Sequence, residues 1–137
     1  MALLVPDVGE VELLKRMLNY TGATVLNVAL RLYTNNLTPA EGDNLASYTE
    51  STGTGYGAIT LTGSSWTIAT VAGTTTAEYA QQTFTYTGAE ANIYGYYVTE
   101  KFTTPTLVLW AERFTDGPYS IPSGGGSVKI TPKIELA

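Results

Sequence analysis

The chain has 137 residues and a net charge of −5, and it contains neither histidine nor cysteine. This length is typical of one domain that buries a core without disulfides. The missing residues exclude Ser-His-Asp and Cys-His catalysis, imidazole and thiolate metal sites, and thiol chemistry. With seven Lys and Arg residues against twelve acidic ones, the chain also lacks the cationic clusters that nucleic-acid binding requires.

Neither a secretory signal nor a transmembrane helix is expected. The first residues, MALLVP, have no basic region and lead at once into Asp7 and Glu10, unlike a signal peptide. The longest uncharged run, Ser51 to Ala77, is too rich in Thr, Gly and Ser to lie in hydrocarbon. We therefore expect neither a membrane nor nucleic acid as a partner.

Residues 7–21 are predicted to form a short α-helix, preceded by an N-terminal arm at residues 1–6. Asp7, followed three residues later by Glu10, has the pattern of a capping box, and Gly22 is a typical stop. A helix of about three turns is marginal alone. Its apolar stripe is therefore expected to pack on a sheet. The stripe consists of Val11, Leu14 and Leu18, joined by Leu13 and Met17.

From Thr24 onward the hydrophobic period becomes two, which predicts strands. The segment TVLNVALRLYT is predicted to be a central strand, with Asn27 and Arg31 on the face opposite its apolar residues. The segment AITLTGSSWTIATVA predicts two short strands joined as a hairpin at Gly63-Ser64-Ser65. The apolar face of the first strand carries Leu26, Val28, Leu30 and Leu32.

Four more strands follow, in TAEYAQQTFTYT, NIYGYYVT, TLVLWAERF and VKITPKIEL. Because Pro132 has no N–H, the last strand is expected to lie at a sheet edge or to be broken there. Many short strands separated by turn residues, with no alternating helices, indicate an all-β chain. We predict one domain, residues 1–137, in which residues 24–136 form an antiparallel β-sandwich or jelly roll behind the short N-terminal α-helix.

The segment NIYGYYVT concentrates tyrosines on one strand. Tyr94 and Tyr96 are predicted to share a face with Val98, while Gly95 and Tyr97 take the other. Tyrosine suits core packing, subunit interfaces and sugar platforms alike. All three roles stay open from the sequence.

A glycine inside a strand marks a bulge or a close approach by a neighbour. At Gly95 a large ring from an adjacent strand is therefore expected to lie over the backbone, with Trp110 or Trp66 as candidates.

Carboxylates are the only catalytic groups left. A glycoside hydrolase needs two of them facing each other across a sugar, and the candidate pairs are Glu100 with Glu112, or Glu78 with Glu90. No spacing brings either pair together, and solvated strand-end residues are the simpler interpretation. The acidic loop at residues 38–44 lacks the spacing of a calcium loop. We therefore expect no enzymatic activity, no cofactor and no metal site.

Several segments together resemble small virion proteins of tailed bacteriophages, cyanophages among them. They are MALLVPDVGEVELLKRML, LRLYTNN with a following TP, GYGAITLTGSSWTIA, FTYTG with IYGYYVTE, LVLWAERF and VKITPKIEL. The likeness covers nearly the full length. It implies a capsid decoration or cement protein, made in the host bacterial cytoplasm and located on the outer capsid surface of the virion. Its implied partners are the major capsid protein and further copies of itself, as a trimer.

The resemblance supplies no catalytic residues. It leaves a tail or fibre component that binds carbohydrate or a host receptor as the alternative. Four apolar residues ahead of the predicted helix have no obvious local partner, so the lattice contact is expected there. The candidate interface residues are Ala2, Leu3, Leu4 and Val5, together with Tyr94 and Tyr96.

Overall fold

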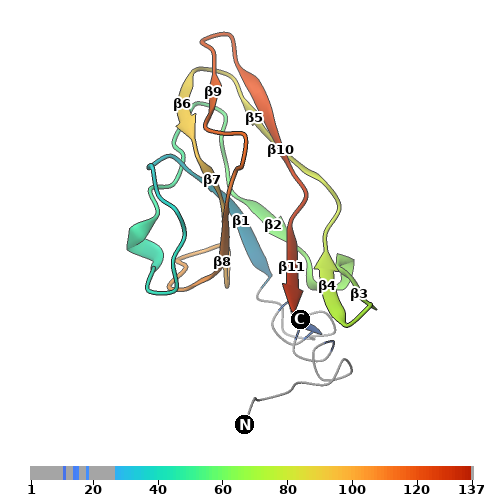
Figure 1. Ribbon diagram of the computed structural model, residues 1–137. Helices are drawn as coiled ribbons and strands as arrows, with labels where there is room; N and C mark the ends of the chain where they lie inside the picture. Colours follow the sequence, from blue (N-terminus) through green and yellow to red (C-terminus); the bar gives the residue numbers. More distant parts are fainter. Residues whose placement is uncertain (1–10, 12–13, 16–17, 19–26, 137) are drawn as a thin grey trace.

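The computed structural model describes residues 11, 14, 15, 18 and 27–136, and these are mainly β (Figure 1). The described residues form eleven strands and two single-turn 3-10 helices, η1 and η2, and the strands pair only antiparallel. The elements are β1 Val28–Tyr33, η1 Leu45–Ser47, β2 Ile59–Leu61, η2 Gly63–Ser65, β3 Thr67–Val71, β4 Thr74–Glu78, β5 Gln82–Tyr86, β6 Glu90–Ile93, β7 Gly95–Thr99, β8 Val108–Arg113, β9 Tyr119–Ile121, β10 Gly126–Ile130 and β11 Lys133–Leu136.

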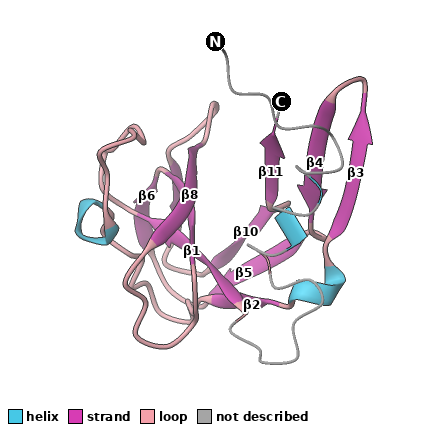
Figure 2. Ribbon diagram, turned by 90° about the horizontal axis from the view of Figure 1, so that it is seen from below, coloured by secondary structure: helices cyan, strands magenta, loops and turns pink. Residues whose placement is uncertain are grey.

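The strands form four sheets, with the orders β2-β1-β7-β8, β11-β4-β3, β10-β5 and β6-β9. Figure 2 shows β8 on one side of the molecule and β11, β4 and β3 on the other, with β5 and β10 running between them. One large apolar cluster joins side chains from β1, β2, β4, β5, β7 and β10. The all-β prediction is confirmed at this level.

The predicted N-terminal arm and most of the predicted helix at residues 7–21 lie outside the described residues. Of the predicted apolar stripe, Leu14 and Leu18 are both buried and belong to the same cluster as the strands. The Leu18 N–H donates to the Leu14 carbonyl at 2.9 Å. The expectation that this stripe packs against a sheet therefore agrees with the two leucines that are described.

Strand β1 is buried along its whole length because both of its faces are covered. Val28, Leu30 and Leu32 point into the large cluster, as the period-two pattern predicts. On the opposite face, Tyr33 belongs to a second cluster with Tyr48 and Tyr97, under the segment at residues 35–48. This second layer has no period-two signature in the sequence.

The predicted hairpin at Gly63-Ser64-Ser65 is wrong. These residues form η2, which carries the chain from β2 in the four-stranded sheet to β3 in the three-stranded one. The anchor is Trp66, whose ring is buried directly after the turn. The true hairpin is β3–β4, where Ala72 and Gly73 form a two-residue loop with φ of 51° and 81°. Positive φ at both positions is what hairpin twist demands.

Two predicted single strands, TAEYAQQTFTYT and VKITPKIEL, are each divided in two. Strand β4 leads into β5 and β10 leads into β11, so the four strands form a long ribbon with a break in the middle. At the break, the Tyr79 N–H donates to the Pro132 carbonyl at 2.9 Å. Strand β11 also lies at the edge of its sheet. The prediction for Pro132 is confirmed, because the strand is broken there and lies at an edge.

The segment NIYGYYVT is also interrupted, at Tyr94, between β6 and β7. Asn92 has a φ of 56°, which breaks the alternation of side chains ahead of β7. Tyr94 consequently packs beside Tyr97 in the second cluster, whereas Tyr96 lies in the large one. The prediction that Tyr94 and Tyr96 share a face is therefore wrong.

Gly95 has no room for a side chain. A Cβ at this position would lie 2.1 Å from the Glu112 carbonyl oxygen and 2.6 Å from the Tyr33 hydroxyl. A ring does approach the glycine, as predicted, but it belongs to Tyr33 and to neither Trp110 nor Trp66.

Candidate interaction site

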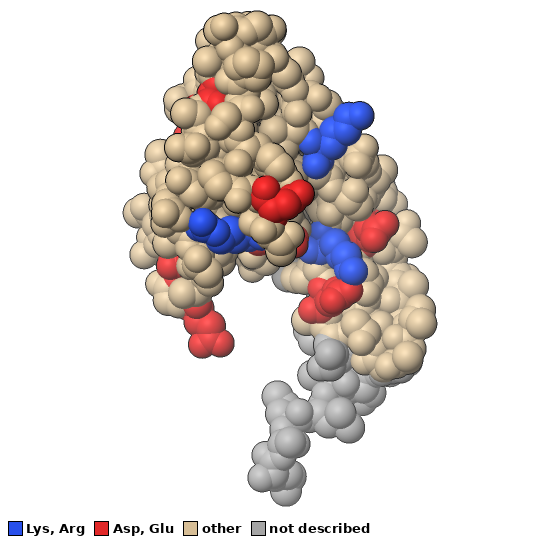
Figure 3. Space-filling view, turned by 45° about the horizontal axis from the view of Figure 1, so that its top comes forward, with Lys and Arg blue, Asp and Glu red and all other residues tan. Residues whose placement is uncertain are grey.

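A cleft of about 360 Å³ separates β8 from β11. Figure 3 shows the surface hollowed between two lobes, with acidic and basic side chains around the hollow. The cleft has an aromatic floor and a charged margin. It is lined by Tyr96, Trp110, Ala111, Glu112, Lys133, Ile134 and Glu135.

The floor of the cleft contains a hydrogen-bonded tyrosine. Tyr96 is 3% exposed, and its hydroxyl donates to Glu112 Oε2 at 2.7 Å. Burial and then the Glu112 carboxylate raise the pKa of Tyr96 well above its usual value. Tyr96 is therefore a neutral donor that orients Glu112.

The margin on the β11 side carries an exposed ion pair. Lys133 Nζ lies 2.5 Å from Glu135 Oε1, and the two side chains are 45% and 51% exposed. The carboxylate of Glu135 raises the pKa of Lys133, so the lysine stays protonated. With Glu112 on the opposite wall, the cleft holds two carboxylates against one ammonium group.

A second pocket, of about 310 Å³, adjoins β8 near the loop at residues 39–43. Asp43 accepts hydrogen bonds from the Ala40 N–H at 2.8 Å and from the Tyr48 hydroxyl at 3.1 Å. Glu41 lies in the same wall, and the lining contains no basic residue. The lining residues are Pro39, Ala40, Glu41, Asp43, Tyr48, Val108, Leu109, Trp110 and Ala111.

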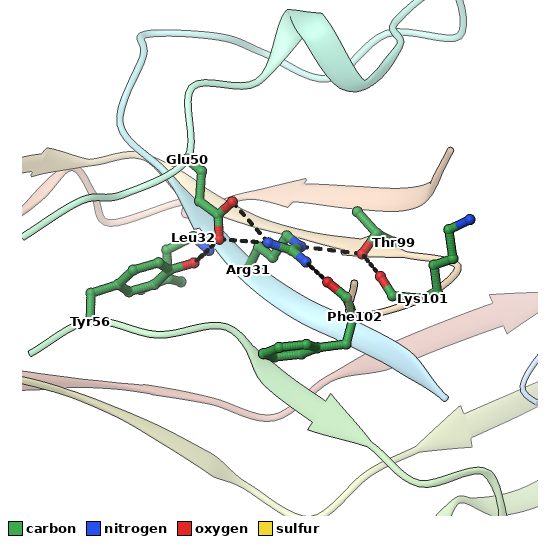
Figure 4. A network of polar contacts seen from close by, with 7 residues as sticks. All are labelled: Arg31, Leu32, Glu50, Tyr56, Thr99, Lys101 and Phe102. Carbon is green, nitrogen blue, oxygen red and sulfur yellow. Dashed lines mark hydrogen bonds and ion pairs between the residues drawn. The ribbon is translucent and has the colours of Figure 1, made fainter. Parts of the chain in front are cut away.

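The four-stranded sheet is held by a buried arginine (Figure 4). Arg31 Nη1 lies 2.9 Å from both Glu50 carboxylate oxygens, and its Nη2 donates to the Phe102 carbonyl at 2.6 Å. Its Nε donates to Thr99 Oγ1 at 3.2 Å. One guanidinium therefore joins β1, β7, the segment before residue 51 and the loop at residues 100–107.

The carboxylate of Glu50 has further partners. The Tyr56 hydroxyl donates to Glu50 Oε1 at 2.9 Å and itself accepts the Leu32 N–H at 3.2 Å. Burial is the main cause that raises the pKa of Tyr56. The network of Arg31, Glu50 and Tyr56 therefore holds the neighbouring loops against β1 and β7.

Glu90 performs the same task for the next loop. Its Oε2 accepts the Ser51 hydroxyl at 2.6 Å and the N–H groups of Thr52 and Gly53 at 3.2 and 2.7 Å. Burial acts to raise the pKa of Glu90, but these hydrogen bonds outweigh it and hold the pKa below its usual value. An ionised carboxylate with this many internal donors is a structural anchor.

The predicted catalytic pairs do not share a site. Glu100 accepts hydrogen bonds from the Thr106 N–H at 2.8 Å and the Leu107 N–H at 3.0 Å, whereas Glu112 bonds to Tyr96. Glu90 holds the loop at residues 51–53. Glu78 lies on β4 opposite Lys133, in another sheet from β6, which carries Glu90.

The described residues contain no group of three or more acidic side chains placed to hold a metal ion. In the same part of the chain, no helix is long and apolar enough to cross a membrane.

Of the predicted interface residues, Ala2, Leu3, Leu4 and Val5 lie outside the described residues. Tyr94 is partly buried, with the Arg113 guanidinium carbon 5.0 Å from its ring centroid. The ring of Tyr96 is core, and only its position on the cleft floor connects it to a surface. The structure does not bring these two tyrosines together.

Comparisons with protein-family models, curated proteins and solved structures give no match. The cleft was not predicted from the sequence, because its walls are more than twenty residues apart and belong to different sheets. The only available signal was the alternation of Lys133 and Glu135 with apolar residues, which is common to any half-exposed strand.

Proposed function

We propose that this chain is a virion structural protein of a tailed bacteriophage, a capsid decoration protein that binds the major capsid protein lattice as a homo-oligomer. The main observation in favour is that Glu50, Glu90 and Glu100 are each engaged by several internal hydrogen bonds. Such an arrangement favours a rigid binding unit over a catalyst. The sequence likeness to virion proteins supplies the setting.

The finer architecture is part of the proposal. We infer a β-sandwich in which the four-stranded sheet and the β11-β4-β3 sheet are the main layers, with the N-terminal helix against them. The shared apolar cluster, which includes Leu14 and Leu18, supports this arrangement. A rigid sandwich with weakly charged surfaces suits repeated contacts on a lattice, where a homo-oligomer multiplies modest affinities.

The lattice contact is proposed at the N-terminal arm. Deleting residues 1–6 is expected to leave a folded protein that no longer co-sediments with expanded capsids. The full-length chain and a Val71→Ser variant are the controls, since Val71 is 74% exposed at a hairpin tip. Normal co-sedimentation of the truncated protein would place the contact elsewhere.

The homo-oligomer is tested separately by light scattering on the purified chain. A trimer is the expected species. A monomer at high protein concentration would contradict assembly before capsid binding.

A second function, carbohydrate binding on a tail or fibre, is favoured by one observation. Trp110 lies in the same cleft as Glu112 and Glu135, which is the combination of ring and acceptors that sugar sites use. Binding on a glycan array that Glu135→Gln abolishes and Glu41→Gln does not would support this function. If the parent chain binds no glycan on the array, the carbohydrate-binding function is excluded.

A further inference from the structure

Two free strand edges border one cleft. Strand β8 ends its sheet in the order β2-β1-β7-β8, and β11 ends its own in the order β11-β4-β3. The cleft is lined by Trp110 to Glu112 from β8 and by Lys133 to Glu135 from β11. Figure 2 shows these two strands on opposite sides of the molecule. The two edges therefore belong to a single site.

The backbone of β8 presents hydrogen-bonding groups on its free edge. The Phe114 N–H donates to the Tyr94 carbonyl at 2.9 Å, which marks a bonded pair between this strand and its neighbour. Bonded pairs alternate along an antiparallel ladder, so Glu112 also bonds inward. Ala111 and Arg113 lie at the alternate positions, and their N–H and C=O groups point away from β7.

The same argument applies to β11. The Tyr79 N–H donates to the Pro132 carbonyl at 2.9 Å, so Lys133 and Glu135 have their backbone groups on the edge away from β4. Lys133 and Glu135 both line the cleft. The free edge of β11 therefore points into the cleft.

Among the described residues, these outward groups have no backbone partner. Across the described residues, no backbone hydrogen bond involves the outward N–H or C=O groups of Ala111, Arg113 or Glu135. The charged side chain of Arg113 does not cover the edge either, since its guanidinium donates to the Leu37 carbonyl at 2.9 Å. An open strand edge is a template for another strand.

The surroundings determine which strand would fit. An added strand turns alternate side chains to opposite faces, and here one face would meet the cleft of about 360 Å³ and the other the pocket of about 310 Å³. The two linings contain four carboxylates and one ammonium group, that of Lys133. The carboxylates belong to Glu41, Asp43, Glu112 and Glu135.

We propose that the cleft between β8 and β11 accepts one extended peptide segment of a partner protein, with Lys or Arg at alternate positions. The segment pairs with the edge of β8 through Ala111 and Arg113, and its alternate basic side chains share the face that meets Glu112 and Glu135 in the cleft. A second copy of this chain is the poorer occupant. Pairing of its β8 with this β8 would place the acidic linings of the two copies next to each other, and like charges repel. The inference does not depend on the proposed function.

The test uses the full chain and a fluorescein-labelled ten-residue peptide that alternates Lys and Val. Anisotropy is expected to rise with protein concentration for this peptide. It should not rise for a Glu-Val peptide of the same length, or for a Lys-Val peptide with alternate backbone amides N-methylated. Absence of binding by the Lys-Val peptide, or equal binding by the Glu-Val peptide, would overturn the proposal.

Ala111→Pro removes an outward N–H without breaking the ladder to β7 and is the decisive variant. We expect its affinity for the Lys-Val peptide to be about tenfold lower, as the loss of one or two hydrogen bonds implies. The matched control is Thr70→Pro on the free edge of β3, which is separated from the cleft by β4 and β11. Equal affinity of parent and Ala111→Pro would exclude pairing at the β8 edge.

Amide hydrogen exchange, read by NMR, identifies the edge directly. Peptide binding is expected to slow exchange at Ala111, Arg113 and Glu135, and to leave Thr70 unchanged. Slow exchange at the first three amides before peptide is added would show that the edge is already occupied, and would overturn the assignment to a partner. If the parent chain is a dimer and Ala111→Pro is a monomer, a second copy of the chain occupies the edge. That result would also overturn the assignment to a partner protein.

Discussion

Two of the ion pairs among the described residues differ in construction: Arg31–Glu50 is largely buried beside β1, and Lys133–Glu135 is exposed at the cleft margin. The arginine side chain is 9% exposed and has two additional acceptors, whereas the lysine side chain is 45% exposed with one ionic contact. Removing one member of a buried pair leaves an uncompensated charge, while exposed pairs contribute little. The first pair therefore maintains the fold, and the second remains available to a partner.

The largest effect is expected for Arg31→Met, which keeps the length of the side chain and removes its charge. Glu50 then loses its cation, and Thr99 and the Phe102 carbonyl lose a donor. We expect the free energy of unfolding to fall by roughly 3 kcal/mol, the low end for a broken buried pair because the Glu50 side chain is 33% exposed. Urea denaturation at pH 7 measures it.

The control for this variant is Lys129→Met, which makes the same charge change on the exposed face of β10. It should unfold at nearly the parent urea concentration. Equal midpoints for Arg31→Met and the parent would mean that the buried network contributes no net stability, and the contrast between the two pairs would be lost.

The sequence predicted where the strands lie better than which strands pair with each other. Period-two patterns located β1 and the β10–β11 region because each has one face in the large cluster. The turn at Gly63 to Ser65 was misassigned, since a glycine and two serines suit a hairpin and a 3-10 turn equally well. What separates them is the burial of Trp66, which depends on residues far along the chain.

The candidate site was less predictable than the fold. Arg31 was placed correctly on the face opposite the leucines, but the pattern could not indicate that Glu50 and Phe102 return to cover it. Tyr94 and Tyr96 were assigned to one face because a left-handed Asn92 cannot be recognised from alternation alone. The pairing of two sheet edges across a cleft is a property of topology, and no local pattern encodes it.

The second prediction sharpens the comparison by testing how rigid the sheet is beside the buried pair. In Gly95→Ala the new Cβ would lie 2.1 Å from the Glu112 carbonyl oxygen, so the backbone of β7 or β8 has to move. We expect a loss of about 2 kcal/mol in the free energy of unfolding. The control is Gly57→Ala, where a Cβ meets nothing within 4 Å. Similar thermal midpoints for the two variants would contradict this packing.

The third prediction concerns pH and Glu90, the other internally bonded carboxylate. Because its folded-state pKa lies below the ordinary value of 4.5, its contribution to stability is complete above about pH 4.5 and is lost as the pH falls through the folded pKa. Glu90→Gln is expected to lower the free energy of unfolding by about 1.5 kcal/mol at pH 7. It should also make the loss of stability below pH 4.5 less steep. The decline should not vanish, since the pKa of Glu100 is also lowered, by hydrogen bonds from Thr106 and Leu107 that outweigh its burial. Urea melts from pH 7 to pH 3 give both slopes, and parallel slopes in parent and variant would contradict the role of Glu90.

The smallest effect on stability is expected at the cleft margin, in Lys133→Met. Lys133 is exposed and its charge is screened by solvent, so the thermal midpoint should stay at the parent value at both low and high salt. The change should instead appear in binding, because removing the only ammonium group in the two linings makes them more acidic. Affinity for the Lys-Val peptide is therefore expected to rise, and Glu135→Gln should lower it. A thermal midpoint as low as that of Arg31→Met would show that the exposed pair supports the fold after all.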